Sequence, residues 1–73
     1  MSKEATVEFN VKVNRITEKA YLVEFKNYKG RSVEEWMPKS QVVDTDVWAE
    51  GDSGLMTVKK WIAEKKEIVK AED

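Results

Sequence analysis

Apolar and polar residues alternate in the first part of the chain. Between Thr6 and Val13 every second residue is apolar, and the residues between them are Glu8, Asn10 and Lys12. A repeat of two is the period of a strand that buries one face and exposes the other. The pattern therefore predicts a strand over residues 6–13.

Two further strands follow after short polar segments. Residues 14–18 (NRITE) indicate a turn, and residues 19–26 (KAYLVEFK) are rich in aromatic and β-branched side chains, which favours a second strand. Both faces of this strand are apolar, so either it is central in the sheet or one of its faces meets something else. Residues 27–30 carry Asn and Gly where a tight reversal needs them, before a third strand over residues 31–37. The first half of the chain is thus predicted to be a meander.

The stretch EWMPKSQVV contains the single proline of the chain, Pro38. Proline has no backbone N–H and ends strand pairing, so a turn over residues 38–40 and a short strand over residues 41–43 are expected. We expect Trp36 to pack inward. The turn would leave three polar residues exposed for recognition of a partner, namely Lys39, Ser40 and Gln41.

The second half is less regular. Residues 44–54 contain two glycines and three aspartates and indicate a loop, pinned to the core by Trp48. A last strand is expected over residues 55–58. Residues 60–69 have helical spacing of their large side chains, and Trp61 and Ile62 are expected to anchor this helix.

Together these elements predict a mainly β fold. We expect a five-stranded, mostly antiparallel, partly open barrel of SH3-like or OB-like kind with a short C-terminal helix, and the meander followed by a proline turn favours the SH3-like kind. Residues 1–73 should form one domain, ordered from about residue 6 to residue 69, with frayed termini. The expected core consists of the periodic apolar positions Val7, Phe9, Val11, Leu22, Val23 and Trp36.

The amino-acid composition excludes several kinds of metal site and catalytic mechanism. The 73 residues include no cysteine and no histidine, so thiolate and imidazole metal sites and the commonest general base at neutral pH are absent. The tetrapeptide GDSG at residues 51–54 matches the surroundings of a serine-protease nucleophile, but a base to accept the serine proton is missing. We therefore expect no enzyme activity, no catalytic residue, no metal and no cofactor.

Charge and hydropathy bear on partners and location. Thirteen basic and fourteen acidic residues leave a net charge of -1, which lacks the positive excess of a duplex-DNA binder. No apolar run resembles a signal peptide or a membrane span. The expectation is a soluble cytoplasmic monomer that does not bind membranes.

Lysines interleaved with aromatic residues leave two kinds of partner open. Tyr28 and Lys29 lie in the predicted reversal, where an exposed ring could stack on a base while the ammonium meets a phosphate, as in single-stranded nucleic-acid binding. The C-terminal helix carries lysines that could dock on an acidic protein surface, among them Lys59, Lys65 and Lys66. The alternative is that the aromatic residues form the core and the lysines are solvated.

Three motifs give a family resemblance. The chain contains K-A-Y-L-V from Lys19, W-M-P-K-S-Q from Trp36 and W-I-A from Trp61. Over about two thirds of its length it thereby resembles a recurrent small domain of phages and prophages with the pattern K-A-x-L-V, W-x-P-K-S-Q, W-[LI]-A. The resemblance implies a small β-rich fold with a C-terminal helix and a phage origin, and no settled activity. More distantly, size and architecture are similar to phage regulators that bind host RNA polymerase.

From this resemblance we expect a non-enzymatic phage protein that binds and modulates a host protein of the transcription or replication machinery, such as RNA polymerase or a replication factor. The alternative is a single-stranded nucleic-acid binding module.

Overall fold

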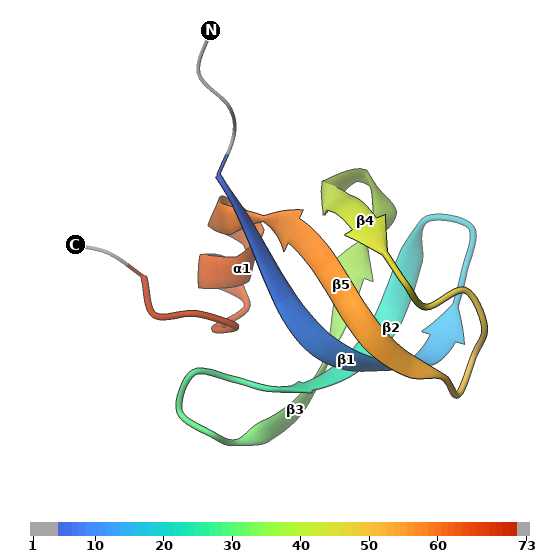
Figure 1. Cartoon of the computed structure of the whole chain (residues 1–73), viewed down its shortest axis with the longest axis horizontal. Coiled ribbons are helices and arrows are strands. Elements are labelled where there is room, and N and C mark those ends of the chain that lie inside the picture. Colours follow the sequence, from blue (N-terminus) through green and yellow to red (C-terminus); the bar gives the residue numbers. More distant parts are fainter. Residues whose placement is uncertain (1–4, 72–73) are drawn as a thin grey trace, which may run out of the picture.

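The computed structural model describes residues 5–71 and contains five strands and one short α-helix (Figure 1). In chain order the elements are β1 (Thr6–Ile16), β2 (Ala20–Lys26), β3 (Ser32–Pro38), the 3-10 helix η1 (Lys39–Gln41), β4 (Val42–Thr45), β5 (Ser53–Lys59) and α1 (Lys60–Lys65). The prediction of a mainly β protein with five strands and a short C-terminal helix is confirmed. The frayed ends that we expected fall in part on residues 1–4 and 72–73, which lie outside the described residues.

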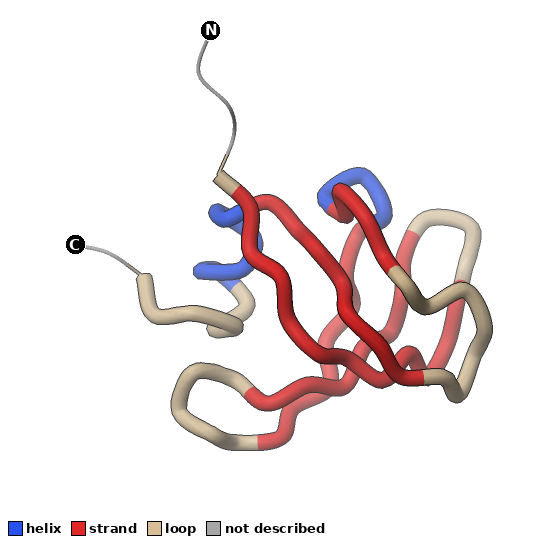
Figure 2. The backbone as a smooth tube through the Cα atoms, in the orientation of Figure 1, coloured by secondary structure: helices blue, strands red, loops and turns tan. Residues whose placement is uncertain are grey.

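The strands form one curved sheet in the order β3-β2-β1-β5-β4, and every neighbouring pair is antiparallel. Strand β1 joins the two halves: residues 6–12 pair with β5, and the register with β2 begins only at Lys12, opposite Glu24. The backbone trace bends along this strand (Figure 2). Within the described residues β3 and β4 are not paired with each other, so the sheet is not closed into a barrel.

Strand β1 is longer than the alternating pattern predicted. The expected turn over residues 14–18 is wrong, because the strand continues through a bulge near Asn14 to Ile16. The reversal is made instead by Thr17, whose backbone N–H donates to the Ala20 carbonyl at 2.8 Å and whose hydroxyl accepts from the Ala20 N–H at 3.1 Å. A bulge adds one residue to a strand and breaks its period of two, which hides the continuation from a sequence pattern.

The loop between β4 and β5 is fixed by a residue that we did not predict. Val47 is buried, and Thr45 Oγ1 accepts from its N–H at 3.1 Å, whereas Trp48 is 74% exposed. The Gly51 N–H donates to the Val13 carbonyl, and the Glu50 carboxylate accepts from the Ile16 N–H at 2.9 Å. The prediction that Trp48 pins the loop is therefore wrong.

The helix α1 ends earlier than its spacing predicted. Glu67 adopts φ 61°, and the Ile68 N–H donates to the Ala63 carbonyl at 2.8 Å while the Glu67 N–H donates to Glu64 at 3.1 Å. These two bonds form a Schellman motif, which ends a helix on a left-handed residue. Ile68 then turns back into the core, so the apolar spacing continues after the helix has ended.

The core lies between the two halves of the sheet and is covered at one end by α1. Of the six predicted core residues, Val11 and Val23 are buried, and Val7 and Phe9 pack against the core from its margin. The remaining buried apolar side chains are Val13, Tyr21, Phe25, Met37, Val47, Met56, Val58, Ile62, Ala63 and Ile68.

Two core predictions fail for the same geometric reason. Leu22 and Trp36 are register partners on β2 and β3, and both lie on the sheet face that turns away from the core. Successive side chains of a strand point to opposite faces, so burial of Val23 and Met37 places their neighbours outside. Trp36 is consequently 45% exposed.

Candidate partner-binding surface

The 3-10 helix η1 forms because β3 stops pairing at Pro38. Pro38 keeps an extended backbone, and the Lys39 N–H still donates to the Lys19 carbonyl at 2.8 Å, so the start of η1 is tied to the turn between β1 and β2. None of the residues of η1 is buried. The turn expected over residues 38–40 is therefore a single 3-10 turn whose polar side chains lie at the surface.

Helix α1 contacts η1 through a side-chain hydrogen bond. The indole Nε1 of Trp61 donates to Oε1 of Gln41 at 3.1 Å. The Nε2 of Gln41 in turn donates to Oγ of Ser40 at 3.2 Å. Trp61 is nevertheless 49% exposed. Of the two residues expected to anchor the helix, Ile62 is buried in the core, whereas Trp61 contacts η1 through this hydrogen bond and is not part of the core.

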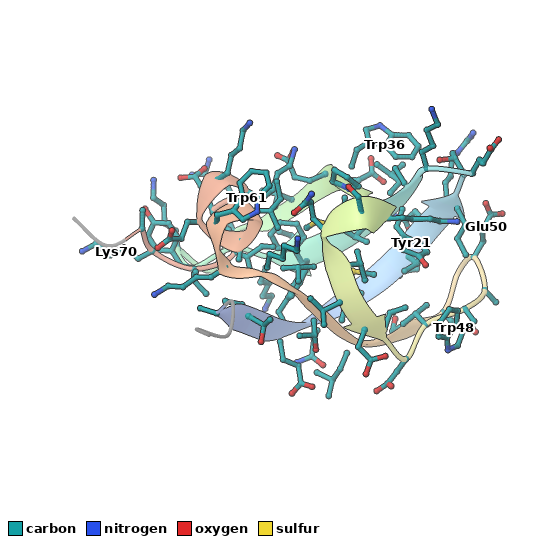
Figure 3. All side chains as sticks on the ribbon, turned by 90° about the horizontal axis from the view of Figure 1, so that it is seen from above. Tyr21, Trp36, Trp48, Glu50, Trp61 and Lys70 are labelled. Atoms are coloured by element: carbon teal, nitrogen blue, oxygen red, sulfur yellow. The ribbon has the colours of Figure 1, made fainter. Side chains whose placement is uncertain are left out.

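Seen from above, Trp61 and Trp36 lie on the same side of the molecule, and Trp48 lies on the other (Figure 3). Trp36 is on β3, the strand that leads directly into η1. We call the two tryptophans and the three residues of η1 together the η1 surface: Trp36, Lys39, Ser40, Gln41 and Trp61.

The polar groups of the η1 surface are already oriented. Lys39 Nζ lies 5.1 Å from the centre of the Tyr21 ring, a cation–π contact that holds the ammonium over a buried aromatic residue. Because Gln41 is held by Trp61 and Lys39 by Tyr21, a partner would meet side chains that lose little conformational freedom on binding. The surface can offer hydrogen bonds, one positive charge and two apolar rings.

The structure separates Tyr28 and Lys29 from this surface. Their turn is attached to the segment after α1, where the Tyr28 N–H donates to the Glu67 carbonyl at 3.0 Å. Lys29 Nζ lies 3.7 Å from a Glu67 carboxylate oxygen and 5.6 Å from the centre of the Tyr28 ring. Tyr28 is exposed, as we expected, but the lysine beside it already has an acidic neighbour.

The three helix-region lysines do not form one outward face. Lys65 is exposed, whereas Lys59 is half-buried at the end of β5. Lys66 is also half-buried, and its Nζ lies 3.5 Å from a carboxylate oxygen of Glu35 on β3. The three lysines that we expected to be available for docking therefore differ in their surroundings, because Lys66 joins the end of the helix to the sheet.

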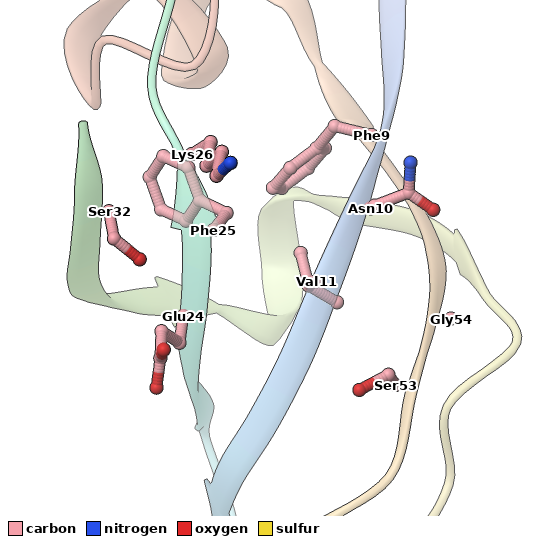
Figure 4. A pocket seen from close by; sticks show the side chains of 9 residues that line it. All are labelled: Phe9, Asn10, Val11, Glu24, Phe25, Lys26, Ser32, Ser53 and Gly54. Carbon is pink, nitrogen blue, oxygen red and sulfur yellow. The ribbon is translucent and has the colours of Figure 1, made fainter. Parts of the chain in front are cut away.

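A groove opens where β1 and β2 diverge (Figure 4). Its volume is about 420 Å³, and the rings of Phe9 and Phe25 meet edge to face at its apolar end with centroids 5.5 Å apart. Glu24, Lys26 and Ser53 supply polar groups at its margin. The full lining consists of Phe9, Asn10, Val11, Glu24, Phe25, Lys26, Ser32, Ser53 and Gly54. The groove is wide and open to solvent.

Within residues 5–71 no group of three acidic, histidine or cysteine side chains is arranged to hold a metal ion. Over the same residues, no helix is both long enough and apolar enough to span a membrane.

The sequence analysis identified three of the five residues of the η1 surface and missed both tryptophans. A signal for Trp36 was present: if Met37 faces the core, the alternation of β3 exposes its neighbour. For Trp61 the sequence held no such signal, because helical spacing alone does not say which of Trp61 and Ile62 faces the sheet.

Comparison with protein-family models, with curated proteins and with solved structures gives no match for this chain.

Proposed function

We propose that this chain is a non-enzymatic binding protein that engages another protein through the η1 surface. The observation that carries the proposal is the exposure of Trp36 and Trp61, at 45% and 49%, in a domain small enough to need its large apolar side chains for the core. Tryptophan is among the residues that dominate the energy of protein interfaces. Two exposed tryptophan rings and a group of polar side chains are the components that protein interfaces combine as an apolar anchor and a polar rim.

The resemblance of the W-M-P-K-S-Q segment to phage domains supports a protein of the bacterial host as the partner. We propose the transcription or replication machinery, reached in the host cytoplasm, and modulation of its activity as the outcome. The η1 surface contains most of this segment, so the residues that carry the resemblance are also those that the fold presents.

We also propose that the sheet belongs to the SH3-like rather than the OB-like kind. Apart from β1 with β5, every hydrogen-bonded pair joins strands that are consecutive in the chain. The first three strands form a meander, and the chain then passes through Pro38 and the single turn η1 into β4 without an α-helix between β3 and β4. These two features support the SH3-like alternative.

Capture from bacterial lysate, with and without nuclease treatment, tests the proposed function. We expect one stoichiometric protein to be retained by the unaltered chain after nuclease treatment and to be lost with Trp61→Ala and with Gln41→Ala. Trp48→Ala is the matched control, since it removes an exposed tryptophan from the other side of the molecule. Retention that is equal in all four proteins would contradict the proposal.

The second candidate function is binding of single-stranded nucleic acid, which exposed Tyr28 beside Lys29 favours. Loss of all retained material on nuclease treatment would support it. The proximity of Glu67 to Lys29 and the net charge of -1 both favour the protein partner instead.

A further inference from the structure

The outer edge of β3 is the longer and more regular of the two edges of the sheet. In the sheet order β3 is terminal, and its seven residues keep a regular register with β2 to the last residue, Pro38. The other edge strand, β4, has four residues and a register shift between Val42 and Asp44. Short, bulged strands resist pairing with further strands, whereas long regular ones accept it.

The pattern of backbone hydrogen bonds between β2 and β3 shows which backbone groups of β3 face the open side of the sheet. At the two ends of the β2-β3 pair the Asn27 N–H donates to the Arg31 carbonyl, and the Lys39 N–H donates to Lys19. Hydrogen-bonded and non-hydrogen-bonded residue pairs alternate along an antiparallel ladder, and all the residues in these two bonds are odd-numbered. The backbone groups of residues 33, 35 and 37 are therefore the ones that bond to β2. The backbone groups of Ser32, Glu34 and Trp36 therefore point to the open side, where the described part of the chain provides no strand.

Two glutamates lie side by side on the outer face at this edge, and Lys12 is the register partner of Glu24 on the other side of β2. Glu24 and Glu34 are direct register partners on β2 and β3, and like charges in that position repel each other. Asn14 on β1 reaches both carboxylates, and its Nδ2 donates to Glu34 at 2.8 Å and to Glu24 at 3.2 Å. The two carboxylates and Ser32 line a shallow hollow of about 330 Å³. The Asn14 amide is neutral and does not cancel the charge of the two carboxylates. A cationic side chain in this hollow would offset the repulsion between them.

From these observations, and on the basis of the proposed function, we propose that the β3 edge binds an extended, basic segment of the partner protein as a sixth strand. Ser32, Glu34 and Trp36 would supply the backbone hydrogen bonds, as in other cases of strand addition. On the outer face, a Lys or Arg opposite Glu34 would enter the hollow. The side chain two positions away in the added strand would pack on the exposed ring of Trp36, which is one of the residues of the η1 surface.

A second copy of the chain fits this edge less well. Two-fold antiparallel pairing about the middle of β3 places either Glu34 opposite Glu34 or Glu35 opposite Glu35. Both arrangements set like charges directly across from each other. Charge complementarity thus favours a basic segment.

Synthetic peptides and the full chain test this inference. The probe is a ten-residue peptide that alternates lysine and valine, and the controls are a peptide with glutamate in place of lysine and a lysine peptide N-methylated at alternate residues. We expect only the first peptide to bind and to slow amide hydrogen exchange at Ser32, Glu34 and Trp36. Glu34→Lys should weaken this binding by about tenfold or more, whereas Asp46→Asn, which removes an exposed acid elsewhere, should leave it unchanged.

The proposal is overturned if the lysine peptide does not bind even at its highest soluble concentration. Equal binding of the N-methylated peptide would overturn strand addition, and equal binding of the glutamate peptide would overturn the basic specificity. Concentration-dependent dimerisation that slows exchange at Glu34 without peptide would assign the edge to a second copy. If the peptide fails while Trp61→Ala still abolishes capture of a host protein, the β3 edge is excluded and the proposed function stands.

Discussion

Trp61 Nε1 donates a hydrogen bond to Gln41 Oε1 at 3.1 Å, although half of the tryptophan surface remains exposed. The bond joins the first turn of α1 to η1, two elements separated by the whole of β4 and β5. It fixes the orientation of an exposed ring without burying it, which is the condition that an interface anchor needs before its partner arrives.

The first prediction separates Trp61 from its neighbour Ile62. Trp61→Phe keeps an aromatic ring and removes the hydrogen bond to Gln41, so the loss in unfolding free energy should be less than about 1 kcal/mol. Ile62→Ala empties a buried position and should cost about 2 to 5 kcal/mol. Urea titration of both variants measures the difference. A larger loss of unfolding free energy for Trp61→Phe than for Ile62→Ala would show that Trp61, and not Ile62, is the core residue of α1.

The second prediction concerns adjacent residues of β3. Met37→Ala should destabilise the domain by about 2 to 5 kcal/mol, because Met37 is fully buried. Trp36→Ala should change stability by about 1 kcal/mol or less, because the ring lies on the outer face. Thermal melts followed by circular dichroism compare the two, and equal losses would contradict the register of β2 with β3.

A third prediction is that Glu67→Gly stabilises the protein. Glu67 holds φ 61°, a conformation that costs an L-residue about 1 to 2 kcal/mol and glycine almost nothing. The exposed contact with Lys29 that would be lost contributes little. We expect a gain in unfolding free energy of about 1 kcal/mol by denaturant titration. Glu67→Ala, which loses the same contact and keeps the strain, is the control and should show no gain.

The fourth prediction uses the close approach of Gly54 to Val47. A Cβ at residue 54 would lie 2.9 Å from Val47 Cγ2, so Gly54→Ala should overpack the core and cost about 1 to 3 kcal/mol. Val47→Ala removes the opposing methyl group. In that background Gly54→Ala should cost almost nothing, and the double-mutant cycle should show a coupling of about 1 kcal/mol or more. Additive losses would show that the two residues do not meet.

The fifth prediction distinguishes two adjacent lysines. Lys65→Glu should leave stability within about 0.5 kcal/mol, because Lys65 is an exposed surface residue. Lys66→Glu sets two carboxylates against each other and should cost about 1 kcal/mol. Adding Glu35→Lys to Lys66→Glu restores opposite charges and should recover most of the loss. The melting temperatures of the three variants at low ionic strength provide the measurement, and no recovery in the double variant would contradict the Lys66–Glu35 contact.

Local patterns determined the elements of this fold. The alternation before Val13, the tight reversal at Asn27–Gly30 and the missing N–H of Pro38 are properties of a few consecutive residues, and they predicted the meander and the turn that follows it. The same polar turn predicted Lys39, Ser40 and Gln41 as candidate binding residues. These three residues form η1, and none of them is buried.

The tertiary structure decided what each aromatic residue does. Burial depends on which face of a strand or helix meets the rest of the domain, and a single bulge or a one-residue shift of register reverses that assignment. Trp36, Trp48 and Trp61 each stand beside an apolar residue that took the core position: Met37, Val47 and Ile62. Both members of each pair are apolar, so the sequence pattern does not distinguish them. Only the assembled sheet, with α1 packed on its end, determines which of the two side chains is buried and which stays exposed to a partner.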